Sequence, residues 1–163
     1  MSTSTTTNLT VSTGLESRVL KEGYGPGAWH GADLKAALAD VTPALAFWRP
    51  GAGRHNIAEV ALHHAYCTRA VRAQLSGKPA EPFVLEGDDW FDLTDDTPLS
   101  WPTVHATVTS EHDRLAALVG EIEARKVVSP LSDEERLNVV LGITCHAIYH
   151  AGQIQLLKRL REE

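Results

Sequence analysis

With 163 residues, 43% of them hydrophobic and 22% charged, the chain has the size and composition of one globular domain that can bury a core without disulfides. Its formal charge of −6, without any run of Lys and Arg, argues against general binding to nucleic acid. No stretch of 18 apolar residues is present, so we expect no membrane-spanning segment.

The first elements in chain order are short. Residues 1–12 are predicted to form a disordered tail. The start of this tail lacks the positive charge and the apolar segment of a signal peptide, so we expect a cytoplasmic protein. Residues 13–163 are predicted to form a single domain. A helical stretch at about 13–22 stops at a run rich in Gly and Pro. A second piece at 28–40 follows, and the two are interpreted as one broken first helix.

Three longer helices are predicted after these pieces. The helix at about 56–75 starts with the pattern of a capping box, in which Glu59 stands three residues after the cap. Residues 80–100, rich in Pro, Asp and aromatic residues, are predicted to be a long crossover packed over the bundle. A helix at 101–124 follows, and a final helix runs from residue 132 to the C-terminus. The sequence therefore predicts an all-α four-helix bundle with one long connection.

Eight histidines are the most unusual feature of the composition. His146 and His150 are four residues apart, so they share one face of the final helix, on a stripe with Ile143 and Leu157 that we expect to face a partner helix. Two imidazoles at this spacing suit a shared metal ion. The alternative is a pair of core histidines that are hydrogen-bonded to their neighbours, and the spacing alone does not decide between the two.

The helix at 56–75 offers two adjacent histidines. Periodicity slightly favours His64 over His63 as the inward residue, but it does not settle which of them binds a ligand. Cys67 and Cys145 each lie in a helical pattern beside a histidine. They are either small buried residues or thiols that act near a metal ion.

Two segments carry a resemblance to a known family. Residues 55–63, with the sequence HNIAEVALH and followed by Ala65 and Tyr66, resemble the second helix of the DinB/YfiT-like metalloenzymes. Residues 145–159, CHAIYHAGQIQLLKR, resemble the fourth helix of that family, and the run Tyr-His-Ala-Gly-Gln-Ile is the most specific part. The similarity extends over most of the chain from Trp29 onward.

The resemblance implies a four-helix bundle that holds one divalent metal ion through one histidine of the second helix and two of the fourth. Carried onto this sequence, these ligands are His63, His146 and His150. The resemblance selects His63 over His64 because His63 follows Ile57 by six residues. Tryptophan is common in the family where this chain has His55 and Cys67, and both differences are expected to reshape the pocket.

Three neutral imidazoles leave coordination positions for water or substrate, and zinc and nickel both suit such ligands. Glu59, one turn before His63, is a candidate general base or hydrogen-bond acceptor, with the capping box as the alternative interpretation. Gln153, Tyr149 and His30 are further candidates for the pocket around the metal ion.

Three functions remain open at this point. The first is a metal-dependent hydrolase, and the second is a thiol S-transferase, because some relatives use low-molecular-weight thiols such as bacillithiol or mycothiol. Arg54, Arg69 and Arg72 are the basic residues that could line a site for such a thiol. The third is a non-catalytic, stress-related protein that binds a ligand. The family also implies a homodimer, for which Trp48, Trp90 and Trp101 are expected to offer aromatic surface.

Overall fold

The computed structural model describes residues 14–162, and the tail predicted at residues 1–12 lies outside them. This part of the chain contains only helices and connecting segments, so the all-α prediction is confirmed. The helices are α1 (Leu15–Gly23), α2 (Leu34–Leu38), α3 (Pro43–Ala46), α4 (Ile57–Ser76), α5 (Trp101–Glu123) and α6 (Asp133–Glu162).

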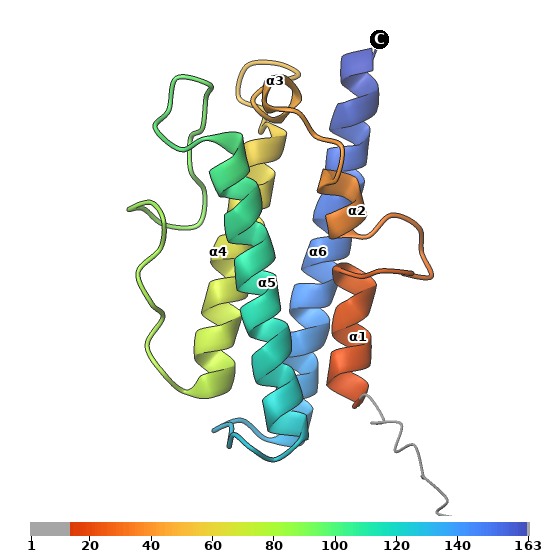
Figure 1. Ribbon diagram of the computed structural model, residues 1–163, viewed down its shortest axis with the longest axis vertical. Coiled ribbons are helices and arrows are strands. Elements are labelled where there is room, and N and C mark those ends of the chain that lie inside the picture. Colours follow the sequence, from red (N-terminus) through yellow and green to blue (C-terminus); the bar gives the residue numbers. More distant parts are fainter. Residues whose placement is uncertain (1–13, 163) are drawn as a thin grey trace, which may run out of the picture.

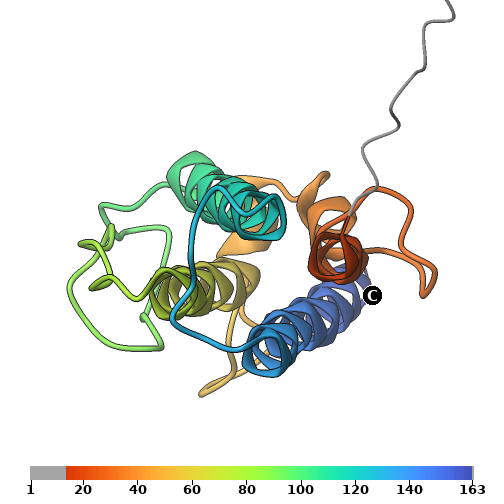
Figure 2. The same ribbon diagram turned by 90° about the horizontal axis from the view of Figure 1, so that it is seen from below.

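The long helices α4, α5 and α6 run side by side, and α1 and α2 follow one another along α6 (Figures 1 and 2). The helix predicted at residues 28–40 is therefore wrong in its extent, since only Leu34–Leu38 are helical. Gly27 and Gly31 take positive φ values of 80° and 122°, which a helix cannot accommodate. The chain turns helical only after Asp33, whose side chain caps the first turn by accepting from the Ala36 N–H.

The helix at 56–75 begins as the sequence predicts. The Asn56 side chain accepts from the Glu59 N–H, and the Glu59 carboxylate accepts from the Asn56 N–H, which confirms the capping box. The final helix starts with the same exchange between Ser132 and Glu135. These local signals fix the starts of the two helices that carry His63, His64, His146 and His150.

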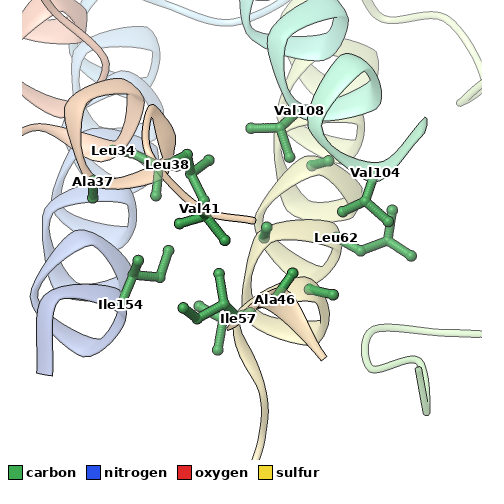
Figure 3. Close-up of a cluster of buried hydrophobic side chains, with 14 of the residues drawn as sticks. Leu34, Ala37, Leu38, Val41, Ala46, Ile57, Leu62, Val104, Val108 and Ile154 are labelled. Carbon is green, nitrogen blue, oxygen red and sulfur yellow. The ribbon is translucent and has the colours of Figure 1, made fainter. Parts of the chain in front are cut away.

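A hydrophobic core joins the helices at the end of the bundle where α2, α3 and the N-terminal half of α4 meet (Figure 3). Leu38, Ile57, Leu62 and Ile154 are each at most 1% exposed. Each side chain of this kind contributes about 1.5–3 kcal/mol to folding when it is fully buried. This packing holds α4 against α6, the two helices that face one another across the histidines.

The connection between α4 and α5 contains no helix and packs against the outside of the bundle (Figure 1). Phe91, Leu93 and Leu99 enter the core, and the Leu93 backbone pairs with two side chains of α4. The expectation that Trp101 adds aromatic surface is wrong, because its ring is 5% exposed and its Nε1–H donates to the Val41 carbonyl at 2.8 Å. None of the helices in residues 14–162 has the length and apolar character needed to cross a membrane.

His112 predicts a pH dependence of stability. The ring stacks on Tyr24 at 4.0 Å, and burial lowers its pKa to about 4 although the negative charge of Asp113 acts in the opposite direction. The unfolded chain therefore binds more protons than the folded chain between pH 6.5 and 4, so stability is full above 6.5 and is lost as the pH falls toward 4. Urea titrations at several pH values should show that the free energy of unfolding depends less steeply on pH in His112→Gln, with a difference of about 3 kcal/mol across this window. Equal slopes in the two proteins would contradict this assignment.

Candidate metal centre

The packing of α4 on α6 brings His63, His146 and His150 together. The Nε2 atom of His146 lies 3.1 Å from His63 Nε2 and 3.0 Å from His150 Nε2. His63 projects from α4, while His146 and His150 occupy successive turns of one face of α6. His146 is thus at the middle of the three rings.

Each of these rings has a hydrogen-bond acceptor at its other nitrogen. His63 Nδ1 lies 3.0 Å from both the carbonyl oxygen and a carboxylate oxygen of Asp89, and His150 Nδ1 lies 2.6 Å from Gln153 Oε1. Both Nδ1 atoms must therefore carry the proton of the neutral ring, because the acceptors have none to give. The Nε2 lone pairs of His63 and His150 then point toward His146.

His146 also carries its proton on Nδ1, because of its contact with His64, which is 2% exposed. The Thr68 hydroxyl donates to the His64 carbonyl at 2.8 Å, so its oxygen is free to accept from His64 Nε2–H at 3.3 Å. His64 Nδ1 then accepts from His146 Nδ1–H at 3.0 Å, which leaves the His146 Nε2 lone pair unprotonated. The two adjacent histidines of α4 therefore contact opposite nitrogens of one ring on α6.

Three lone pairs at such separations repel one another unless a cation lies between them. In a tetrahedral zinc site with Zn–N distances of about 2.0–2.1 Å, two nitrogen ligands are about 3.3 Å apart. The observed separations of 3.0 and 3.1 Å are close to this distance between two nitrogen ligands. Histidines that bind metals usually donate their second ring N–H to a carboxylate, a carbonyl or a similar acceptor, as all three do here.

Burial keeps the rings of His146 and His150, and that of His64 beside them, neutral. Burial, with further contributions from the neighbouring imidazoles, lowers the pKa of His146 to about 4, lowers that of His150, and lowers that of His64 well below its ordinary value. Imidazoles must be neutral to bind a metal ion, so the rings do not have to lose protons at neutral pH before they bind one.

Cys67 lies beside the three rings. Its Sγ is 3.9 Å from His63 Nε2, and donor atoms of His63, Cys67 and His146 all lie within 4.8 Å of one another. This group could hold a metal ion. Burial, with a smaller effect of Asp89, raises the pKa of the Cys67 thiol to about 11, so the thiol is protonated at neutral pH in the metal-free protein.

The crossover segment covers the centre. The Trp90 ring stacks on His63 at 3.9 Å and on His55 at 3.8 Å, with interplanar angles of 5° and 13°. Asp89 has a positive φ of 62°, a conformation that aspartate tolerates better than most residues. No sequence pattern pointed to Asp89, and Trp90 was expected only to offer aromatic surface, because the places of both residues depend on how a segment without periodicity docks.

Gln153 and Tyr149 lie next to His150. Gln153 turns its amide oxygen to His150 Nδ1 and donates from Nε2 to the Tyr149 hydroxyl at 3.2 Å. The Tyr149 ring also meets the His150 ring edge-on at 5.3 Å. His30 is not brought to the centre: it is exposed, and its Nε2 contacts the Glu22 carbonyl at 2.7 Å.

Glu59 is buried at the N-terminus of α4 in a set of structural bonds. Its carboxylate binds the Arg49 guanidinium through both oxygens, at 2.5 and 2.9 Å, and accepts from the Leu93 N–H at 2.9 Å and from His55 at 3.0 Å. Burial alone would raise the Glu59 pKa, but these hydrogen bonds lower it overall. Because these partners occupy both carboxylate oxygens, Glu59 is better suited to cap and anchor the helix than to act as a general base.

A groove of about 640 Å³ runs beside the centre, between the start of α4 and the second half of α6, with Arg54, His55 and Gln153 in its wall. Gln153 is the residue that contacts His150, and His55 stacks on Trp90, so the groove adjoins the residues around the three rings. Arg69 and Arg72 line a different groove.

Substitution of His64 tests whether it orients His146. His64→Leu removes the acceptor at His146 Nδ1 and should weaken zinc binding 10–100-fold, the usual effect of losing such a partner. His64→Asn should bind zinc more tightly than His64→Leu, because asparagine Oδ1 is as many bonds from Cα as histidine Nδ1. Competition titrations against a chromophoric chelator give the affinities. A leucine variant with wild-type affinity would rule out this role.

Fold and side chains together define an all-α protein with a histidine and cysteine group that could hold a metal ion. The sequence model of the DinB superfamily matches residues 28–154, and the chain belongs to this superfamily. Neither a curated protein nor a solved structure gives a significant match. The matched range includes the histidines and cysteines discussed above, together with the crossover segment.

Proposed function

We propose that the chain binds one divalent metal ion, zinc or nickel, through the Nε2 atoms of His63, His146 and His150. The observation that carries this proposal is the set of acceptors at the three Nδ1 atoms, which leaves the Nε2 lone pairs free, with Nε2 of His63 and of His150 lying 3.1 and 3.0 Å from Nε2 of His146. Core histidines that merely satisfied one another would alternate donors and acceptors. Here the hydrogen bonds fix the same tautomer, with the proton on Nδ1, in His63, His146 and His150.

We further propose that the protein is a metal-dependent S-transferase that joins an anionic low-molecular-weight thiol to a small electrophile. A bound divalent ion would lower the pKa of a thiol that reaches it. Arg54 lies in the groove beside the centre, where its guanidinium can pair with a carboxylate of the thiol. Arg69 and Arg72 contact Glu81 and Glu111 in the other groove, which leaves Arg54 as the thiol-binding candidate.

Other residues of the chain would serve this reaction by positioning and shielding. Asp89, His64 and Gln153 hold the protons at Nδ1 of the three rings. Trp90 covers His63 and limits the access of water from the crossover side. A metal-dependent hydrolase is the second candidate, and it ranks lower because Glu59, the carboxylate once expected to be its base, is occupied by Arg49 and Leu93.

The test uses untagged protein that is stripped of metal and reloaded with zinc or nickel. Chlorodinitrobenzene is offered with bacillithiol, mycothiol or cysteine: the sulfur bonds to the ring carbon, chloride leaves with its electron pair, and the thiol proton goes to solvent. We expect conjugation that depends on the metal and, in Arg54→Ala, a KM for the thiol raised about 10-fold with unchanged metal content. Hydrolysis of nitrophenyl esters without conjugation would select the hydrolase. No metal-dependent turnover of either kind would select the non-catalytic ligand-binding alternative.

We also propose that the protein forms a homodimer through α6. Leu141, Tyr149, Leu156 and Leu160 follow helical spacing on this helix and are 43–64% exposed, and exposed Cys145 lies among them. Light scattering should give the mass of a dimer for the wild type and of a monomer for Leu141→Glu, a position outside the groove beside the centre. A wild-type monomer at micromolar concentration would refute the proposal.

A further inference from the structure

Two pairs of potential ligands with the same spacing face each other across the bundle. His63 and Cys67 are four residues apart on α4, and His146 and His150 are four residues apart on α6. Side chains at this spacing lie on one face of a helix, one turn apart. Donor atoms of His63, Cys67 and His146 lie within 4.8 Å of one another, and His150 Nε2 lies 3.0 Å from His146 Nε2.

The distances suit a single tetrahedral site. With Zn–S of about 2.3 Å and Zn–N of about 2.0–2.1 Å, a sulfur and a nitrogen ligand are about 3.6 Å apart. Cys67 Sγ lies 3.9 Å from His63 Nε2, and it stays within 4.8 Å of the His146 donor atom. His63 and His146 belong both to this group and to the three-histidine set, so a metal ion held by these two rings lies within reach of the sulfur.

We propose that Cys67 is a fourth ligand of the metal ion, so that the resting centre has a His3Cys donor set. This inference rests on the proposed metal site and adds to it. When the ion binds, the thiol releases its proton to solvent, and a sulfur lone pair forms the bond. The fourth ligand completes the tetrahedron of the resting centre, where a substrate thiol would have to displace it, and a thiolate favours zinc over nickel among the two candidate ions.

Cobalt(II) replaces zinc in the test because thiolate coordination to it gives a near-ultraviolet charge-transfer band. Full-length untagged wild-type protein should bind one equivalent of cobalt and show this band. Cys67→Ser should bind cobalt without the band. Cys145→Ser is the matched control and should keep it, since Cys145 is exposed and lies outside the group of donor atoms.

A second measurement avoids substitution. In the zinc-loaded wild type, iodoacetamide should spare Cys67, and removal of zinc by a chelator should raise the modification rate of Cys67 at least 10-fold. Peptide mass spectrometry distinguishes Cys67 from Cys145. Cobalt binding without the band, a band that survives in Cys67→Ser, or equal alkylation of Cys67 with and without zinc would overturn the inference alone. Failure of the wild type to bind cobalt or zinc would overturn the proposed metal site as well.

Discussion

His146→Ala is expected to abolish stoichiometric metal binding, the largest single effect of any substitution in the chain. His146 stands between the other two rings, with its Nε2 3.1 Å from that of His63 and 3.0 Å from that of His150. Its removal leaves the remaining nitrogens without the ligand that lies next to both. We expect the bound zinc to fall from about one equivalent to near zero. The affinity should fall by more than the 10–100-fold that is typical when a residue hydrogen-bonded to a metal ligand is lost.

Plasma mass spectrometry of untagged protein, dialysed against zinc and desalted, measures this content. His30→Ala is the matched control, because His30 is exposed and its ring contacts the Glu22 carbonyl of α1, away from the three histidines. Circular dichroism confirms that the helices persist in the variants. A His146→Ala protein that retains one equivalent at wild-type affinity would show that the ion binds elsewhere.

Glu59→Ala is expected to lower the free energy of unfolding by about 3–5 kcal/mol, as is usual when one partner of a buried ion pair is lost. Glu59 is 1% exposed and holds Arg49, His55 and the backbone of Leu93. The substitution leaves the Arg49 guanidinium and the Leu93 N–H without their acceptor. It also removes half of the capping box at the start of α4.

Chemical denaturation of metal-free protein measures this loss independently of any reaction. Glu134→Ala is the control, since Glu134 is an exposed acid in the first turn of α6, and its removal should change stability by no more than about 0.5 kcal/mol. A Glu59→Gln variant with full stability but no turnover would support the general-base role instead. An unchanged midpoint in Glu59→Ala would contradict the anchoring role.

Local signals made the long helices predictable. The capping pattern at Asn56 and Glu59 and the acidic start of the final helix are read from adjacent residues, and both helices begin where those signals stand. The spacing of His146 and His150, together with the family resemblance for His63, also predicted which imidazoles would be neighbours. Their distances agree with that expectation, while their role as ligands stays a prediction.

The parts that the sequence did not reveal depend on tertiary docking. Periodicity presented His63 and His64 as alternatives, yet the structure buries both. His63 contacts Nε2 of the His146 ring, and His64 contacts Nδ1 of the same ring. Asp89 and Trp90 come from a connection with no helical or strand period, so no pattern could place them over His63. The extent of α2 was missed because two glycines interrupt the segment that precedes it.

The crossover segment has an evolutionary consequence. It supplies Asp89 and Trp90 to the centre, yet no helix runs through it, so mutations in it break no bond between turns of α4, α5 or α6. Its anchors, Phe91 and Leu93, lie next to the residues that face the rings. Insertions before Asp89 can therefore reshape the entrance while the anchors stay in place. The helices hold the imidazoles, while the part of the crossover before Asp89 can change in length and sequence without altering their positions.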